Sequence, residues 1–291
     1  MKILTLNTHS LVEKDYEKKL GWFVEAVCRE KPDIIALQEV NQSADAPEAE
    51  GLAASGFVRA QGEEVPVRQD NHAFRAAKMI REAGILCSWT WISAKLGYGK
   101  YDEGMAFLVP EGKILETDSF YISRVRDYNV WKTRKVLGIR AEGLEDWFYT
   151  AHMGWWEDEE EPFLNQWQEL EKRLKGPREQ GTVWLMGDFN SPAAVRGQGY
   201  DYIKSHGWQD TWELAEKKDS GITVEGVIDG WRKLLDEKDA GAAGMRIDHI
   251  WCSKKVSVAS SNVMFNGRKE PKVSDHFGVF IETKKKGENR R

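Results

Sequence analysis

Polar residues of types that bind metal ions and phosphates follow a series of apolar segments. They occur in LTLNT (Asn7), IALQEVN (Glu39), TAHMG (His152), LMGDFNSP (Asp188, Asn190), RIDHIW (Asp248) and VSDHFG (Asp275, His276). Carboxylate and amide oxygens suit Mg²⁺, which prefers a few carboxylates, several waters and substrate phosphate. Because the end of a buried strand is a rigid position, side chains placed there can converge on one cleft. The set therefore indicates a Mg²⁺ site built from strand ends.

Each segment alone also has a structural explanation. Asn7 can satisfy a strand end, GDFN can form a turn through its own backbone, and His152 can be a hydrogen-bonded core residue. The functional interpretation depends on finding all six segments in one chain, each at the end of a predicted strand. Alternation along a strand places His249 on the face opposite Asp248, so we interpret it as structural. By the same alternation His9 lies on the same side as Asn7 and could approach the cleft, but a structural role is favoured.

The elements that must position these residues alternate between strand-like and helix-like patterns. Helices are predicted over 13–30, over 70–83 with Asp70 as the cap and Gly84 as the end, from Pro162 to about 174, and over 197–206. Strands are predicted at KILTLNT and DIIALQ, near 85–92, 104–109, 113–121, 134–140 and 146–151, and at TVWLMGD, RIDHIWCS, VSVASSNVMF and HFGVFIE. The stretch 213–245 is expected to carry loops. This pattern predicts two packed sheets with helices on their outer faces.

Composition indicates the kind of protein and its compartment. The three cysteines, Cys28, Cys87 and Cys252, are scattered outside any CxxC spacing, which is typical of thiols in a reducing compartment. No segment reaches the ~20 apolar residues of a membrane span, and the N-terminus lacks the features of a signal peptide. The net charge of −5 gives weak support against a nucleic-acid partner. We expect a cytoplasmic protein with a single domain over 1–283 and a disordered basic tail at 284–291.

The ordered motifs resemble those of the endonuclease/exonuclease/phosphatase superfamily. The strongest are QEV near residue 39, GDFNSP near 188 and SDHFGV near 275, and the resemblance extends from Met1 to about Glu282. It implies a four-layer α/β sandwich of two mixed sheets flanked by helices, and a metal-dependent phosphoester hydrolase. The implied cofactor is Mg²⁺, for which Mn²⁺ can substitute. Glu39 is then expected to be the main metal carboxylate, with Asn7 beside it and Asp275 adding to the site.

The resemblance also implies catalytic roles. His152 is expected to donate a hydrogen bond to a phosphate oxygen. Asp188 and Asn190 are expected to orient the attacking water and to steady the charge on the phosphoryl oxygens. His276 resembles the essential histidine of the family, and Asp248 the carboxylate that holds it. Either Asp188 or His276 can be the general base.

Two further residues are candidates through the same resemblance. Glu103, in YDEGMAF, matches a carboxylate that supports the histidine equivalent to His152; a solvated strand-end charge is the alternative. Arg134, in WKTRKVLG, opens a strand in the region where family members contact substrate phosphate; a surface salt bridge is the alternative.

The loop MGWWEDEEEP after His152 bears on the choice of substrate. Trp155 and Trp156 are expected to form a pocket wall against a sugar ring, and the five acidic residues behind them to repel a nucleic-acid duplex. This loop, with NTHS, YGKYDEGMAFL and WKTRKVLG, resembles bacterial sugar-phosphate phosphatases of the maltose 6′-phosphate phosphatase kind. We therefore expect a small phosphomonoester, such as a phosphorylated sugar, as substrate. The alternatives are a metal-dependent nuclease, a sphingomyelinase-like phosphodiesterase, or a non-catalytic binding module.

Overall fold

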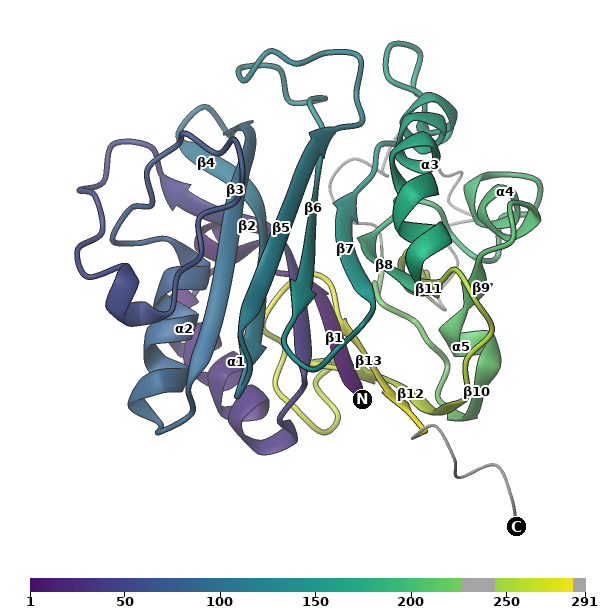
Figure 1. Ribbon diagram of the computed structural model, residues 1–291. Coiled ribbons are helices and arrows are strands. Elements are labelled where there is room, and N and C mark those ends of the chain that lie inside the picture. Colours follow the sequence, from purple (N-terminus) through teal and green to yellow (C-terminus); the bar gives the residue numbers. More distant parts are fainter. Residues whose placement is uncertain (227–243, 285–291) are drawn as a thin grey trace.

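Two mixed β-sheets form the centre of the protein in the computed structural model, which describes residues 1–226 and 244–284 (Figure 1). The seven-stranded sheet has the order β10-β12-β13-β1-β2-β4-β3, and the six-stranded sheet has the order β5-β6-β7-β8-β11-β9. The first comprises β1 (Lys2–Asn7), β2 (Ile34–Ser43), β3 (Cys87–Gly97), β4 (Tyr101–Pro110), β10 (Ala215–Lys218), β12 (Val258–Met264) and β13 (Gly278–Thr283). The second comprises β5 (Ile114–Tyr121), β6 (Lys135–Ala141), β7 (Trp147–His152), β8 (Val183–Asp188), β9 (Gln209–Asp210) and β11 (Asp248–Cys252).

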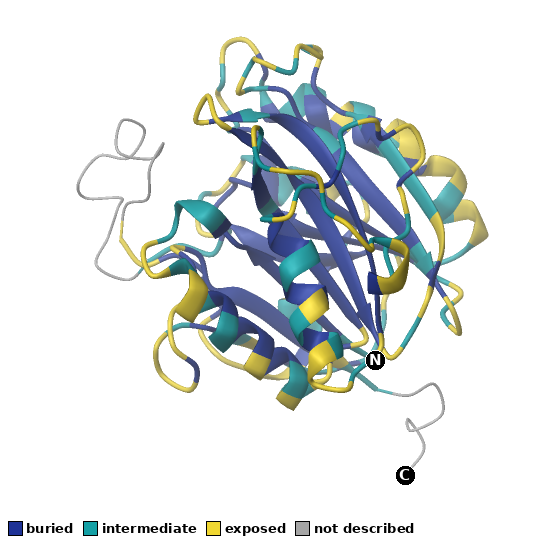
Figure 2. Ribbon diagram, turned by 90° about the vertical axis from the view of Figure 1, so that its left-hand side faces the viewer, coloured by how far each residue is buried: buried dark blue, intermediate teal, exposed yellow. Residues whose placement is uncertain are grey.

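Helices cover the outer face of each sheet, as Figure 1 shows. The first sheet is covered by α1 (Tyr16–Glu30) and α2 (His72–Glu82), and the second by α3 (Phe163–Gln180) and α4 (Gly199–Ser205). Shorter turns of helix are η1 (Ser10–Val12), η2 (Ala53–Ser55) and α5 (Thr211–Leu214). The strands are buried almost throughout, whereas the helices expose their outward faces (Figure 2). The predicted four-layer sandwich is confirmed.

Apolar residues on both faces explain why the central strands are continuous apolar runs. In β2, Ile35 and Leu37 pack toward α1 and α2, whereas Ile34 and Ala36 face the second sheet. Because successive side chains of a strand point to opposite faces, a strand covered on both sides must be apolar at every position.

The topology brings six strand ends together. β1 pairs in parallel with β2, and β7 in parallel with β8, so the carboxyl ends of these four strands meet at one end of the sandwich. β13 runs antiparallel to β1 and β11 antiparallel to β8, so their amino ends reach the same place. In the strand register, Asp188 of β8 lies opposite His152 of β7 on one side and opposite Asp248 of β11 on the other.

Some local predictions were wrong or lie outside the described residues. The cap of α2 is Asn71, whose side chain accepts a hydrogen bond from the backbone N–H of Phe74 at 3.1 Å. The Asp70 carboxylate instead accepts the backbone N–H of Ser43. The stretch 213–245 contains part of α5 and β10 as well as loops, and its residues 227–243 lie outside the described residues, as does the tail from 285. Within the described residues, no helix is long and apolar enough to span a bilayer.

Candidate active site

A bulge in β2 places Glu39 at the site. The register between β2 and β4 shifts between Leu37 and Val40, and Glu39 has a φ of 50°. Its carbonyl oxygen accepts hydrogen bonds from Thr8 Oγ1 at 3.0 Å and Ser10 Oγ at 2.7 Å. A bulge redirects a side chain from the regular alternation of its strand, and a positive φ is unusual for a residue with a Cβ. The chain thus holds Glu39 in an uncommon backbone conformation that several hydrogen bonds fix.

Asn7 connects Glu39 to the second sheet. Its Nδ2 donates to Glu39 Oε1 at 2.9 Å and to Asp188 Oδ2 at 3.2 Å. Asn7 therefore bridges the two carboxylates through its amide NH₂, while its Oδ1 accepts the backbone N–H of His9 at 3.3 Å. Burial, together with the negative charges of Glu103 and Asp275, raises the pKa of Glu39.

Asp188, Asp248 and His276 form a buried cluster (called here the inner cluster), whose ligand atoms lie within 4.8 Å of one another. His276 Nδ1 is 2.9 Å from Asp248 Oδ2, and His276 Nε2 is 3.9 Å from Asp188 Oδ2. Burial opposes the charged imidazolium, but the charge and hydrogen bond of Asp248, followed by the charge of Asp188, raise the pKa of His276 well above its ordinary value. These contacts therefore favour the imidazolium form of His276, with Asp248 beside Nδ1.

Burial and the neighbouring Asp248 raise the pKa of Asp188 to about 7. Its Oδ1 accepts the backbone N–H of Asn190 at 2.8 Å, and Asn190, at a φ of 46°, donates from Nδ2 to the carbonyl oxygen of Met153 at 2.9 Å. The preceding Gly187 has a φ of 134°, and a Cβ there would lie 2.1 Å from the carbonyl oxygen of Ala151. Only glycine allows β8 to pair this closely with β7 beside Asp188.

His152 faces both acidic sites from the end of β7. Its Nδ1 lies 3.9 Å from Glu39 Oε1, and its Nε2 lies 3.6 Å from Asp188 Oδ2. Burial and the positive charges of Arg134, Lys95 and His276 lower the pKa of His152 well below its ordinary value. These surroundings therefore favour the neutral imidazole, which can donate one N–H.

Lys95 is a buried cation that the sequence reasoning missed, and it changes the expected role of Glu103. Lys95 Nζ lies 3.0 Å from Glu103 Oε1, so Glu103 forms its ion pair with Lys95 and not with His152. Lys95 follows a register shift in β3 between Ser93 and Lys95, and both members of the pair are buried. A lysine within a strand carries no sequence signal of this placement.

Arg134 is buried, at 6% exposure, and not part of a surface salt bridge. Its Nη1 donates to the carbonyl oxygen of Trp131 at 2.8 Å, and its Nε has no hydrogen-bond partner among the described residues. Burial lowers the pKa of Arg134, opposed by the negative charges of Glu103, Asp188 and Glu39.

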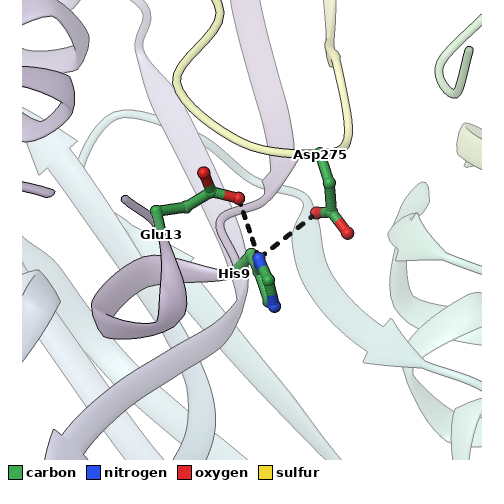
Figure 3. A group of neighbouring side chains, drawn as sticks. All are labelled: His9, Glu13 and Asp275. Atoms are coloured by element: carbon green, nitrogen blue, oxygen red, sulfur yellow. Dashed lines mark hydrogen bonds and ion pairs between the residues drawn. The ribbon is translucent and has the colours of Figure 1, made fainter. Parts of the chain in front are cut away.

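A second carboxylate–histidine cluster (called here the outer cluster) lies nearer the surface and contains His9, Glu13 and Asp275. Figure 3 shows one ring nitrogen facing both carboxylates, and the distances from His9 Nδ1 are 2.8 Å to Glu13 Oε1 and 3.8 Å to Asp275 Oδ1. Although burial opposes protonation, Glu13, Asp275 and Glu39 raise the pKa of His9 to about 9. Asp275, expected as a metal ligand, is thus paired with His9.

The two adjacent tryptophans diverge, so the predicted two-tryptophan wall is wrong. Trp156 is partly buried and packs against the core that α3 and α4 cover, with ring centroids 5.8 Å from Phe163 and 6.0 Å from Tyr202. Trp155 points the other way, toward Trp131 at 5.5 Å and a small apolar cluster that includes Ile247, next to Asp248.

The acidic run behind them has structural functions, which weakens its use as an argument against nucleic acid. Glu161 is buried and accepts the backbone N–H groups of Arg124 and Val125. Asp158 and Glu160 pair with Lys132 at 2.8 and 2.9 Å.

His249 lies on the face opposite Asp248, as predicted. Its Nδ1 is 3.0 Å from Arg246 Nη1, and its ring packs against Phe189, Tyr200 and Trp251.

Comparison with known proteins agrees with this geometry. Residues 4–276 match the model of the endonuclease/exonuclease/phosphatase family. A family protein from Leptotrichia buccalis is 30% identical, with a TM-score of 0.81, over 98% of this chain and 100% of that one. A mannosyl-6-phosphatase from Bacteroides thetaiotaomicron shares the fold at 18% identity and a TM-score of 0.61, over 98% and 100% of the two chains. TDP2 from Caenorhabditis elegans does so at 17% identity and a TM-score of 0.59, over 97% of this chain and 73% of that one. No curated protein gave a significant match.

The family match, the two-sheet sandwich and the convergence of carboxylates and histidines agree with one another. Members of this family are metal-dependent phosphoester hydrolases. The chain belongs to the endonuclease/exonuclease/phosphatase family.

Proposed function

We propose that this enzyme is a Mg²⁺-dependent phosphatase of small phosphomonoesters such as phosphorylated sugars. The observation that carries this proposal is the pair of buried cations, Lys95 and Arg134, whose charges act on His152 and on Glu39. A phosphomonoester carries about −1.5 to −2 charge at pH 7, more than the single charge of a diester. Two buried cations beside the candidate site would offset that additional charge, although Lys95 shares its charge with Glu103.

The acidic residues fit a hard divalent cation. Glu39 is half-buried, and its burial together with the charges of Glu103 and Asp275 raises its pKa, so added positive charge there would stabilise the ionised form. Glu39 is the proposed main ligand, with Asn7 and Asp275 beside it; oxygen donors of this kind favour Mg²⁺, with Mn²⁺ as a substitute. When bound, the cation supplies positive charge to the phosphoryl oxygens and the leaving oxygen.

The favoured protonation states of His152, His276 and Asp188 are the basis on which we assign their roles. Neutral His152 donates an N–H to a phosphate oxygen. His276, protonated and held by Asp248, stabilises developing negative charge from Nε2. Asp188, with a pKa of about 7, is then the general base that accepts a proton from the attacking water, and Asn190 holds its carboxylate in place. The electrostatics thus favour Asp188 over His276 as the base.

Substrate specificity and metal dependence test the proposal together. With Mg²⁺, the enzyme is expected to release phosphate from hexose 6-phosphates and p-nitrophenyl phosphate, and to cleave bis(p-nitrophenyl) phosphate and plasmid DNA poorly. EDTA should abolish turnover, Mg²⁺ or Mn²⁺ should restore it, and Glu39→Gln should nearly eliminate it. Robust DNA cleavage alongside negligible monoester turnover would establish the nuclease alternative, and full activity in EDTA would contradict the metal-dependent mechanism.

The cation pair has its own test. Lys95→Met should lower kcat/KM by about 10²-fold for the monoester, on the scale of one lost electrostatic contact, and by less than about three-fold for the diester. Lys95→Met leaves the Glu103 carboxylate buried without its partner. The double variant Lys95→Met/Glu103→Gln removes both charges, so it shows the effect of losing Lys95 without an unpaired buried carboxylate. The matched control is Lys135→Met, since Lys135 is also largely buried but bonds the carbonyl oxygen of Ser93 at 2.8 Å. An equal loss on both esters would show that Lys95 does not select for monoesters.

The three cysteines are free thiols, which supports the expected cytoplasmic location.

A further inference from the structure

We propose that Trp131 and Trp155 form an aromatic subsite that binds the carbohydrate ring of a phosphorylated sugar while the phosphate reaches Arg134 and His152. The inference rests on the proposed phosphatase function and adds a binding site for the part of the substrate that no catalytic residue contacts. It also replaces the pair Trp155 and Trp156, which the structure separates.

Trp131 is unusual in its exposure. It is 49% exposed, and the other large apolar side chains with comparable exposure in the described part of the chain are Leu86, Tyr98 and Leu115. Six other tryptophans are fully buried: Trp89, Trp91, Trp167, Trp184, Trp208 and Trp251. An indole ring left in water forgoes a large burial free energy, and exposed aromatic rings beside a polar site often mark a place where a ligand covers them.

The backbone of Trp131 contacts the phosphate-facing arginine. Arg134 Nη1 donates to the carbonyl oxygen of Trp131 at 2.8 Å. The turn between them is fixed, because Thr133 donates its N–H to the carbonyl oxygen of Val130 and its Oγ1–H to that of Asp127. A substrate phosphate bound at Arg134 would therefore lie beside the turn that carries the Trp131 ring.

Trp155 joins this surface from the second loop. It follows His152 by three residues, and its ring centroid lies 5.5 Å from that of Trp131 at an interplanar angle of 56°. Behind it, Val224 and Ile247 are fully buried and support the ring next to Asp248. The loops that carry the two tryptophans, β5–β6 and β7–α3, both lie at the upper end of the sandwich in Figure 1.

Ion pairs hold the two loops together. Lys132 binds Asp158 and Glu160, and its Nζ lies 5.3 Å from the centroid of the Trp131 ring. Glu161 binds the backbone of Arg124 and Val125 from the same loop. Because these contacts fix both loops, little further ordering is needed when a ligand binds.

The shape of the subsite favours a sugar ring over a nucleobase. Two rings inclined at 56° form an angle and not the parallel slot that would hold a flat base between two faces. A sugar presents an apolar C–H face to one indole and hydroxyl groups around its edge, for which the exposed carboxylate of Glu160 is an acceptor. The structure thus assigns the specificity for the carbohydrate part to Trp131 and Trp155.

The test compares a phosphomonoester that has a sugar ring with one that has none. Trp131→Ala should lower kcat/KM for glucose 6-phosphate by about ten-fold, mainly through KM, and change it less than two-fold for glycerol 3-phosphate, which has no ring. Trp131→Phe should retain most of the activity. Leu115→Ala, which truncates another exposed apolar side chain, on β5, should change kcat/KM for neither substrate.

A binding measurement separates this inference from the phosphatase proposal. In the catalytically impaired Asp188→Asn protein, glucose 6-phosphate should change the tryptophan fluorescence, and adding Trp131→Phe should remove most of that change. If wild-type enzyme hydrolyses neither monoester, the proposed function fails. If it hydrolyses both and Trp131→Ala reduces them equally, or reduces a nucleoside monophosphate more than glucose 6-phosphate, the carbohydrate subsite is wrong while the phosphatase stands.

Discussion

The inner and outer clusters contain the same chemical groups, two carboxylates and one histidine, in different surroundings. In the inner cluster all three residues are buried, at 1–3% exposure. In the outer cluster His9 and Glu13 are partly exposed, and the Asp275 side chain is 38% exposed. Both histidines have a raised pKa, because each faces carboxylates.

The difference lies in what burial does to the carboxylates. In the inner cluster it raises the pKa of Asp188 to about 7, which makes that residue a proton acceptor near neutral pH. In the outer cluster the hydrogen bond from His9 and the ion pair with Lys19 lower the pKa of Glu13 despite partial burial, so Glu13 is a fixed negative charge. The same residue types thus give a reactive centre where water is excluded and an electrostatic anchor where it is not.

The largest expected effect comes from the inner cluster. Asp188→Asn and His276→Ala should each lower kcat for a phosphomonoester at least ~10²-fold, because they remove the proton acceptor and the charge that faces it. KM should change much less, since neither residue is proposed to bind the carbohydrate. Steady-state kinetics at saturating Mg²⁺ measure both constants, and an effect confined to KM would reassign the pair to substrate binding.

An intermediate effect concerns stability, and its sign follows from the raised pKa of Asp188. The folded pKa of about 7 exceeds the ordinary value of 3.8, so protonation of Asp188 stabilises the fold at low pH, and this contribution is lost as the pH rises through that window. In EDTA at pH 8, Asp188→Asn should therefore raise the free energy of unfolding by on the order of 4 kcal/mol.

Urea unfolding at pH 4 and pH 8 measures this difference. The two proteins should have similar stability at pH 4, and the advantage of the asparagine variant should appear as the pH rises. If Asp188→Asn is less stable than wild type at both pH values, the charges and hydrogen bonds around the Asp188 carboxylate fully offset the cost of burying it without metal.

The smallest effect is expected in the outer cluster. His9→Gln and Glu13→Gln should each lower kcat/KM by less than about five-fold, because solvent screens the charges that they remove. Steady-state kinetics on the same monoester provide the comparison, with Lys113→Met as a control for an exposed charge that pairs with Glu142 outside both clusters. A loss of 10²-fold in His9→Gln would break the comparison, since it would place His9 among the residues that act on the reaction.

The sequence predicted the described strands other than β9 and β10, and with them the placement of most residues of the candidate site, because a strand end is visible as an apolar run followed by polar residues. Parallel pairing of β1 with β2 and of β7 with β8 then brings Asn7, Glu39, His152 and Asp188 to one place. The side-chain alternation that separates Asp248 from His249 could be read from sequence for the same reason.

The parts that sequence did not predict depend on irregular backbone. Lys95 follows a bulge, which has no pattern of its own, so its ion pair with Glu103 could not be anticipated. Trp155 and Trp156 are adjacent in a loop, where no periodicity determines which ring enters the core. The cap of α2 is Asn71 and not the predicted Asp70. Both residue types are good caps, so the sequence pattern does not decide between two neighbours.

The pairing of β1 with β13 has a consequence for biosynthesis. Thr5 pairs with Val279, and the two flanking segments supply Asn7 from the first strand and His276 from just before the last. A chain still emerging from the ribosome has made Asn7, Glu39 and His152 long before His276, and β1 has no antiparallel neighbour until β13 arrives. The chain therefore gains His276 and the antiparallel partner of its first strand in one closing event.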